Sequence, residues 1–373
     1  MIDTRYTYLD GLRCVAFLGV YVFHATQAWP NIWHWTYLLG TYGVQTFFVL
    51  SGFLIGGILL DIRAKGIASV GPVMKAFYAR RSLRIFPAYY LTLALIIILS
   101  ILGFKDLGQT SFVRWHAVYL TNIAYFIARS WPGCQSHLWT LSVEEQFYLI
   151  APFALLLMPF RTLCWTFVSI WLGCAVMRWY CWTIHDDFIR LLTPMQMDSL
   201  TVGIAAAIVK RSGSFLGLTF ERLNRFGPVV WCLALGTLIN THPDNRSVAA
   251  EISQPFAQWL FAVTTASLIL RSINRPNGRL AKSLSHPSLV YLGQISYGLY
   301  LCHLFCIDLF RYNLAWFADR QVVGMVAAFV LSVGVASISW FVVERPLNRY
   351  KTRFPYPKGL ATVATEAELV LIQ

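Results

Sequence analysis

Long apolar runs recur along almost the whole chain, and no other feature constrains the fold as strongly. A helix needs about 20 apolar residues to cross a bilayer. Only 13% of the residues are charged, against about 25% in a soluble domain. We therefore expect an all-α polytopic integral membrane protein with ten spans, at residues 8–29, 36–60, 87–104, 141–159, 163–182, 194–210, 228–241, 254–271, 289–311 and 321–343.

The positive charges predict how these spans are oriented. If both termini are cytoplasmic, the inner segments hold 21 Lys and Arg and the outer segments hold 6. Cytoplasmic loops of membrane proteins are enriched in these residues. The net charge of +13 is therefore explained by a lipid bilayer and not by nucleic acid. We expect one membrane domain over residues 1–350 and a short cytoplasmic tail over 351–373.

The stretch 113–128 is also apolar, but it is not counted as a span. Arg114, Trp115 and His116 stand near its start, which is typical of an interfacial or re-entrant segment. Counting it as a full span would invert every later loop and place most of the positive charges outside.

The apolar part of the first span is interrupted by Arg13 and His24, although charge at membrane depth is costly and usually functional. Their spacing of eleven residues puts both on nearly the same stripe of a helix, about 16 Å apart along its axis. Asp10 lies one turn before Arg13 and is expected to pair with it. The orientation of the spans places Arg13 toward the cytoplasm and His24 in the outer half.

A second polar cluster stands in "FYARRSLRIFPAYY", residues 77–90. Arg81 and Arg84 are one turn apart, beside Arg80, where the second cytoplasmic loop is expected to enter the third span. Pro87 is expected to break the helix near that point. Guanidinium groups bind phosphate through paired hydrogen bonds. Anionic lipid headgroups are the alternative ligand for this cluster.

Further ionisable and phenolic groups lie inside the predicted spans. By depth, we expect one carboxylate of the Glu144–Glu145 pair, Asp198 and His303 to meet His24 in the outer half of the membrane. Tyr297 and Tyr300 stand one turn apart on the helix of His303. The residues expected to form or support the site are Asp10, Arg13, His24, Ser51, Arg81, Arg84, Glu144, Glu145, Asp198, Tyr297, Tyr300 and His303.

Three other patterns are given little weight. Ser51 has no nucleophile-elbow motif around it, and a serine in a spanning helix usually bonds its own backbone or a neighbouring helix. His303 and Asp308 spell an H-x4-D motif, but five residues on a straight helix point them about 140° apart. Cys302 and Cys306 flank His303, yet a buried cysteine usually packs as a small apolar side chain, so we expect no metal.

The chain resembles the membrane-bound acyltransferase 3 family. The resemblance rests on seven stretches that occur in the family's order over about residues 8–350: "LDGLRCVAFLGVYVFH", "GVQTFFVLSGFLI", "RRSLRIFPAYY", "LWTLSVEEQFYLI", "MDSLTVG", "ISYGLYLCH" and "ERP". It implies a ten-span enzyme of the bacterial cytoplasmic membrane, EC 2.3.1. Such an enzyme moves an acyl group, usually acetyl, from cytoplasmic acyl-CoA to a hydroxyl of a cell-surface or lipid-linked saccharide.

The resemblance also assigns roles. The family's Arg-x10-His motif falls on Arg13 and His24, its Arg-x-x-Arg motif on Arg81 and Arg84, and its glutamate on Glu144. Gln196 stands where the family often has an arginine, two residues before Asp198, so the partner of Asp198 is open. Some members carry a fused extracytoplasmic domain. Because this chain ends early, the transfer is finished in the membrane domain or by a partner protein.

Together these observations predict a mechanism. Arg13, Arg81 and Arg84 hold the phosphates of acyl-CoA. His24 acts as general base on the acceptor hydroxyl, and Glu144 orients it and stabilises the imidazolium. Direct transfer and an acyl-histidine intermediate both stay open, and a tyrosine or His303 polarises the thioester. The alternative function is a transporter or flippase for an anionic lipid-linked substrate, since buried histidines and carboxylates also relay protons.

Overall fold

The described part of the chain is a bundle of helices, and it contains no strand. The computed structural model describes residues 6–27, 30–66, 69–104, 107, 109–212, 248–313 and 320–357. Within these ranges six helices are long and apolar enough to cross a membrane, or seven if one bent pair counts as a single span. The chain is therefore an integral membrane protein with an all-α fold. The predicted span at 228–241 lies outside the described residues.

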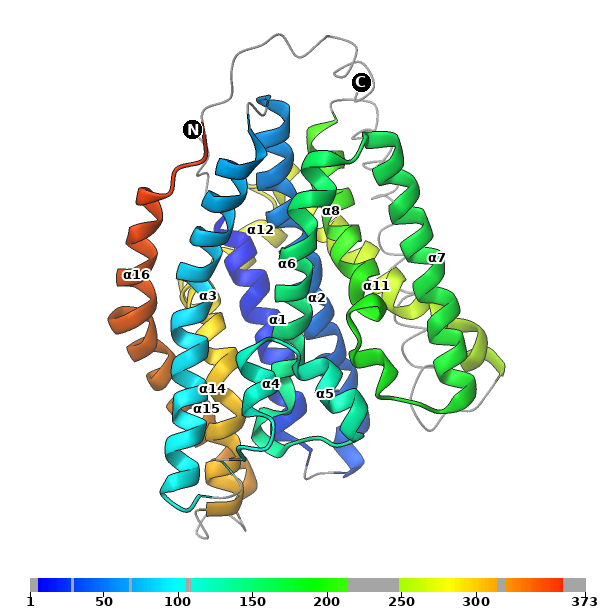
Figure 1. Cartoon of the computed structure of the whole chain (residues 1–373). Helices are drawn as coiled ribbons and strands as arrows, with labels where there is room; N and C mark the ends of the chain where they lie inside the picture. The colour runs from blue at the N-terminus through cyan, green and yellow to red at the C-terminus, as the bar shows by residue number, and fades with distance from the viewer. Residues whose placement is uncertain are drawn as a thin grey trace.

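Two helices form the centre of the bundle, α1 (Thr7–Ala25) and α2 (Pro30–Ala64). Helix α1 packs against α2, α13 and α14, and α2 packs in turn against α6, α8 and α11. Figure 1 shows α1 behind α3 and α6, enclosed by the other helices. Its stripe of ionisable residues therefore lies inside the protein and is not exposed to lipid.

The outer helices carry the lipid-facing surface. Leu172 and Val176 on α7 are 64% exposed, and Val330 and Ile338 on α15 are similarly open. Large apolar side chains at such exposure are unusual on a soluble protein but suit hydrocarbon. The remaining helices are α3 (Val70–Ile101), α4 (Val113–Ala117), α5 (Thr121–Ala128), η1 (Gly133–Leu138), α6 (Trp139–Leu157), α7 (Phe160–Ile184), η2 (Ile189–Leu191), η3 (Thr193–Gln196), α8 (Met197–Arg211), α11 (Val248–Asn274), α12 (Arg279–Leu284), α13 (Pro287–Gln294), α14 (Ser296–Asp308), η4 (Leu309–Asn313), α15 (Gln321–Ser339), η6 (Trp340–Glu344), α16 (Arg345–Arg349) and η7 (Tyr350–Arg353).

Helix α3 corrects one prediction, because Pro87 lies inside it and does not break it. The helix begins at Val70, so the arginine cluster lies on continuous helix and not in a loop. A proline removes one backbone donor, and neighbouring helices in a membrane protein often satisfy the carbonyls left near it. The carbonyl that lacks its helical donor because of Pro87 is that of Leu83, and two residues on the Tyr297 hydroxyl donates to the carbonyl of Ile85, at 2.9 Å.

The predicted span 289–311 is also not one straight helix. It consists of α13 and α14, which meet at an angle of 76° around Ile295. Tyr297, Tyr300 and His303 all lie on α14, while α13 packs against α1, with Gly293 close to the backbone of Asp10. Residues 113–128 form α4 and α5, which have 5 and 8 residues and are each too short to span a bilayer, as expected for this segment.

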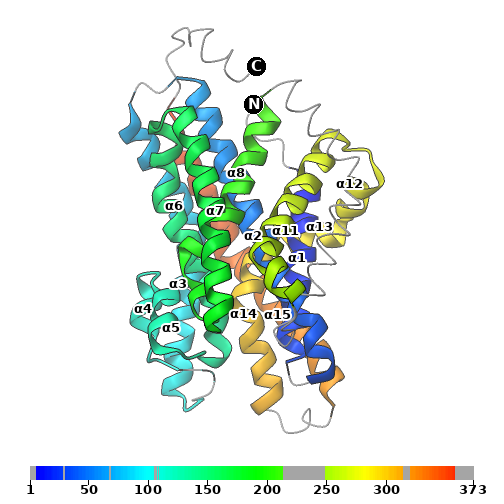
Figure 2. The same cartoon turned by 90° about the vertical axis from the view of Figure 1, so that its right-hand side faces the viewer.

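Two glycines fix α8 closely against α2. A Cβ atom on Gly52 would lie 1.9 Å from the carbonyl oxygen of Leu200, and one on Gly203 would lie 2.2 Å from that of Val49. Small residues allow such backbone contact between helices in membranes, where packing has to replace the hydrophobic effect. Figure 2 shows α7, α8 and α11 together on the face turned to the viewer, so this contact joins the α7 side of the bundle to its centre.

Candidate active site

Two connected cavities open beside the first half of α1. The larger, which we call the wide cavity, has a volume of about 1090 Å³. Its lining residues include Tyr6, just before α1, and Arg13 in the second turn of α1. The smaller, the narrow pocket, has a volume of about 90 Å³ and lies between α1, α2, α3, α6 and α14. Both are lined by Arg13, Leu54, Arg84, Ser296 and Tyr297, so one leads into the other.

Basic side chains dominate the wide cavity, and some are already neutralised. Arg13 donates to Asp10 at 3.2 Å, which confirms the predicted pair, and Arg211 binds both oxygens of Asp61 at 2.7 and 2.8 Å. Arg84 forms no hydrogen bond or ion pair with any residue in the described part of the chain. Its guanidinium is therefore left to bind an anion that enters the cavity.

Arg81 lines the narrow pocket next to Arg84. Its guanidinium lies over the ring of Tyr148, 5.0 Å from the centroid. Their spacing in the sequence predicted that Arg81 and Arg84 lie side by side. In the structure both line the same pocket as Arg13. The three arginines that the family motifs single out therefore converge, although they come from two helices about 70 residues apart in the chain.

Glu144 lies in the narrow pocket on the side of the arginines. It accepts a hydrogen bond from the Ser51 hydroxyl at 2.6 Å, and the Tyr148 hydroxyl is 3.2 Å from both side chains. The structure does not bring Glu144 into hydrogen-bond contact with His24, so the expected direct pair is absent. The neighbouring Glu145 points elsewhere on α6, and its buried Oε1 has no partner among the described residues.

A cluster of three buried imidazoles surrounds the second ionisable residue of α1. The ring of His24 is 5.3 Å from that of His303, and His303 is 5.0 Å from His137. The three side chains are 9%, 0% and 2% exposed, respectively. The expected meeting of His24 with His303 is therefore observed, whereas His137, which directly precedes the stretch "LWTLSVEEQFYLI", was not among the residues expected from the sequence. We call these three residues the histidine cluster.

A hydrogen bond defines the tautomer of one member of the histidine cluster, His303. His303 Nδ1 is 2.7 Å from the carbonyl oxygen of Tyr300, which can only accept, so this nitrogen carries the proton. The Nε2 of His303 and both ring nitrogens of His137 are buried without a partner in the described structure. Buried polar atoms are rarely left unpaired, so the cluster is a place where water or a ligand is expected.

Tyr300 separates the narrow pocket from the histidine cluster. Its hydroxyl lies 2.7 Å from that of Thr140 and 3.3 Å from the carbonyl oxygen of His137. Its ring is 5.3 Å from the His137 ring. Tyr300 therefore belongs to both sites. Tyr297 lines the cavities too, but its hydroxyl is held by α3.

Asp198 belongs to a different network, so the prediction that it meets His24 is wrong. Its carboxylate accepts from Arg178 at 2.6 Å, and Arg178 also donates to the carbonyl of Met195. Gln196 instead bonds Gln45 of α2 at 2.8 Å. Where the family often has an arginine two residues before this aspartate, the present chain supplies the positive charge from α7. The signal that could have revealed this partner was an arginine inside a predicted span, Arg178 within residues 163–182.

Groups that could hold a metal ion are not found among the described residues. Cys302 contacts the carbonyls of Leu299 and Ser332, and Asp308 lies 3.7 Å from Arg311. Through these contacts, Cys302 and Asp308 take part in the packing of the helices around His303.

The apolar helices, the basic cavities and the histidine cluster define the class: a membrane-embedded protein with an internal polar site. Residues 6–342 match the family described as an acyltransferase domain. The chain therefore belongs to this acyltransferase family, as the sequence resemblance predicted.

Individual relatives agree with this assignment. The chain is 28% identical over 91% of its length to a Bacillus subtilis protein named "Putative peptidoglycan O-acetyltransferase YrhL", covering 54% of that protein. It is 27% identical over 91% of its length to the peptidoglycan O-acetyltransferase OatA of Listeria monocytogenes, covering 55% of it. The chain thus spans about half the length of the curated relatives it matches. No solved structure matches it.

Proposed function

We propose that this protein is an O-acyltransferase of the EC 2.3.1 class that moves an acyl group, most simply acetyl, from acyl-CoA to a hydroxyl of a cell-surface or lipid-linked saccharide. The family and the names of the relatives support the transfer of an acetyl group. The observation that carries the proposal is the row of sites along α1: basic cavity, narrow pocket and histidine cluster.

Arg13, Arg81 and Arg84 are proposed to bind the phosphates of the donor. Guanidinium pairs suit phosphate because their N–H groups match its oxygens. The wide cavity has room for the nucleotide, and the narrow pocket leads the acyl end past Arg13 toward Tyr300. Glu144 is proposed to hold Ser51 and Tyr148 in place there and to offset part of the arginine charge.

His24 is the proposed general base. It takes the proton of the acceptor hydroxyl as the oxygen attacks the thioester carbonyl. A tetrahedral intermediate forms, the carbon–sulfur bond then breaks, and the imidazolium returns the proton to the CoA thiolate. His303 lies beside His24 and replaces Glu144 as the nearest candidate to support the charged ring. An acyl-histidine intermediate would use the same residues.

The proposal includes the orientation of the chain. Ten spans with both ends in the cytoplasm place the wide cavity on the acyl-CoA side of a bacterial cytoplasmic membrane and the C-terminal end of α1 on the other side. The 21 positive residues on the inner segments support this orientation. Residues 1–350 would then form one catalytic domain with a short tail at 351–373.

Acyl-transfer assays of purified protein in nanodiscs test this function. His24→Ala is expected to lower kcat by at least about 100-fold, the usual effect of losing a general base, with the Kd for acetyl-CoA unchanged. Arg84→Ala is expected to raise that Kd by about 10- to 100-fold. Arg161→Ala, at the exposed start of α7, is the matched control and should behave as wild type. Normal turnover in His24→Ala would end the base assignment.

A transporter or flippase for an anionic lipid-linked substrate is the second candidate, favoured only by the buried histidines and carboxylates. Release of free CoA from labelled acetyl-CoA by wild-type protein separates the two. A transporter would leave the thioester intact, whereas the proposed enzyme consumes it.

A further inference from the structure

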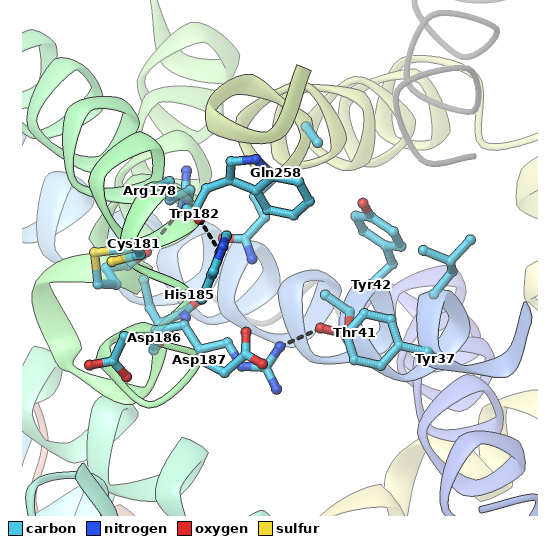
Figure 3. Close-up of a pocket in the computed structure, with 15 residues that line it drawn as sticks. Tyr37, Thr41, Tyr42, Arg178, Cys181, Trp182, His185, Asp186, Asp187 and Gln258 are labelled. Atoms are coloured by element: carbon cyan, nitrogen blue, oxygen red, sulfur yellow. Dashed lines mark hydrogen bonds between the residues drawn. The ribbon is translucent and has the colours of Figure 1, made fainter. Parts of the chain in front are cut away.

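A third cavity lies apart from the donor site, at the C-terminal end of α7. It has a volume of about 150 Å³ and is enclosed by α2, α7, the segment before α8, and α11. One buried water needs only about 10–15 Å³ of such space. We call it the α7 cavity. Figure 3 shows Arg178, Trp182 and His185 on one wall and Tyr37, Thr41 and Tyr42 on the wall that faces them.

The lining combines aromatic rings with polar groups of both kinds. Tyr37, Tyr42 and Trp182 supply flat apolar surface, and Asp187 stands exposed at the margin. Arg190 also lines the cavity, and its guanidinium contacts the Tyr37 hydroxyl. Binding sites for small polar ligands are built this way, with apolar area for contact and a few polar groups for orientation.

Two buried polar atoms of the lining residues lack a partner in the described structure. They are Nε of Arg178, a donor, and Oε1 of Gln258, an acceptor. A hydroxyl group can satisfy both, because it donates and accepts. A phosphate or carboxylate could satisfy only the arginine. The positive charge of Arg178 is moreover already neutralised by Asp198, 2.6 Å away.

The electrostatics of the cavity also disfavour an anion. Asp186 and Asp187 both line it and oppose the positive charge of Arg190. Asp186 also forms an ion pair with Arg129, at 2.5 Å. A neutral ligand rich in hydroxyl groups fits this balance of charges, and its carbon–hydrogen faces can pack on the aromatic rings.

The α7 cavity adjoins the proposed base. The ring of Tyr37 is 5.9 Å from that of Phe23, and Phe23 is 4.7 Å from the ring of His24. Phe23 therefore contacts both Tyr37 of the cavity lining and the proposed base. The narrow pocket reaches the histidine cluster through a different residue, Tyr300. The cluster thus adjoins two cavities, of which the basic one is suited to the donor.

We propose that the α7 cavity is the acceptor subsite and binds one uncharged sugar residue of the saccharide, with Trp182 as its stacking platform and Arg178 and Gln258 as its hydroxyl contacts. This inference rests on the proposed function. It places the sugar hydroxyl next to Phe23, from where a small movement of that ring admits it to His24.

Saturation-transfer NMR on protein in nanodiscs tests the subsite, with chitotetraose and cellotetraose as uncharged oligosaccharide probes. Wild-type protein is expected to bind at least one of them. Trp182→Ala and Gln258→Leu are expected to weaken that binding by about tenfold or more, the effect of losing roughly 1.4 kcal/mol. Trp179→Ala changes the same residue type on the lipid-facing side of α7, where Trp179 is 51% exposed, and should bind as wild type.

Activity separates this inference from the proposed function. In both cavity variants KM for the saccharide should rise while KM for acetyl-CoA stays within about twofold. Equal saccharide binding in Trp182→Ala and Trp179→Ala, or no binding of either probe by wild-type protein, would overturn the acceptor subsite. Failure of wild-type protein to release CoA from acetyl-CoA would instead refute the proposed function.

Discussion

A contact with Gln27 bears on which ring nitrogen of His24 carries the proton. The Gln27 amide lies 3.3 Å from Nδ1 of His24. If the amide nitrogen of Gln27 donates to Nδ1, the ring proton of His24 is on Nε2. Nε2 then cannot take a proton from the acceptor, so it cannot act as the base. If the amide is turned over, its oxygen accepts from Nδ1 and Nε2 is free to take a proton. Both orientations of the amide keep the same contact, and they predict opposite effects on catalysis.

A substitution at Gln27 tests this arrangement. We expect Gln27→Glu, which offers only acceptor oxygens, to retain or raise kcat, because it holds the proton on Nδ1. Gln27→Met, which keeps the length without the polar group, should lower kcat by about tenfold or more. Steady-state assays of acetyl transfer provide the measurement. If both variants keep wild-type kcat, Gln27 does not set the tautomer of His24.

Ser51 is the residue whose role the structure sharpens most. The 2.6 Å hydrogen bond to Glu144 would also suit an activated nucleophile. The proposed mechanism makes it a positioning residue, so Ser51→Ala should retain at least about a tenth of the wild-type kcat, as expected for a lost hydrogen bond of roughly 1 kcal/mol. A loss beyond about 1000-fold, with an acyl adduct in wild-type protein by mass spectrometry, would make Ser51 the nucleophile.

Sequence spacing predicted the residue pairs within one helix but not those between helices. Asp10 with Arg13, and Arg81 beside Arg84, follow from helical geometry alone. Glu144 was expected near His24 because both are ionisable and of similar predicted depth. Its real neighbours, Ser51 and Tyr148, are set by how α6 rotates against α2, which no local spacing encodes.

At the scale of elements, the Arg178–Asp198 pair joins α7 to α8 in the buried interior. Breaking a buried ion pair from one side leaves an unpaired charge and typically costs 3–5 kcal/mol. We expect Arg178→Met to lower the thermal midpoint in detergent markedly. Arg129→Met, which removes the exposed partner of Asp186, serves as the control. Its expected loss of folding free energy is about 1 kcal/mol or less, as for other exposed ion pairs. Equal midpoints for the two variants would contradict a structural role of the buried pair.

The short helix α4 carries a pH-dependent contribution to stability. Its His116 is fully buried, with Nδ1 2.8 Å from the Thr121 hydroxyl and Nε2 3.0 Å from the Gln135 carbonyl oxygen. Burial lowers the pKa of His116 from 6.5 to about 4. The neutral ring is therefore favoured in the folded protein, and the unfolded chain takes up a proton first as the pH falls.

The expected consequence is a loss of stability between pH 6.5 and 4 and none above 6.5 from this residue. The size is on the order of 3 kcal/mol over the whole window. Thermal denaturation across this range should show a weaker pH dependence in His116→Gln, which has an uncharged side chain throughout. An identical pH dependence in wild type and variant would show that His116 is not responsible.

Element boundaries reveal what apolar patterns cannot predict. The apolar runs located most membrane helices correctly, because every backbone group in lipid must be satisfied within a helix. They missed the bend at Ile295 and the passage of α3 through Pro87. The two places contact each other, since the hydroxyl of Tyr297 donates to the carbonyl of Ile85, and an apolar pattern does not encode such contacts between helices. Beyond the bend, α14 places the ring of His303 5.3 Å from that of His24 on α1 and the hydroxyl of Tyr300 2.7 Å from that of Thr140 on α6.

At the scale of the whole molecule, α1 orders the sites. Its first half borders the basic cavities, its last turn carries His24, and the α7 cavity adjoins that turn through Phe23. The sequence predicted the two ends of this path from Arg13 and His24 alone. It did not predict the α7 cavity, whose walls come from four separate parts of the chain and carry no common motif.

The order of the sites predicts that the two outer cavities open on opposite sides of the membrane. Lys65 lines the wide cavity and Asp187 the α7 cavity, and both are exposed. In an active cysteine-free background, Asp187→Cys should react with a membrane-impermeant maleimide in intact cells. Lys65→Cys should react only after the cells are permeabilised, because the positive-inside distribution places it in the cytoplasm. Labelling of both positions from the same side would contradict a path that crosses the membrane, and with it the delivery of an acyl group from cytoplasmic acyl-CoA to an acceptor on the far side.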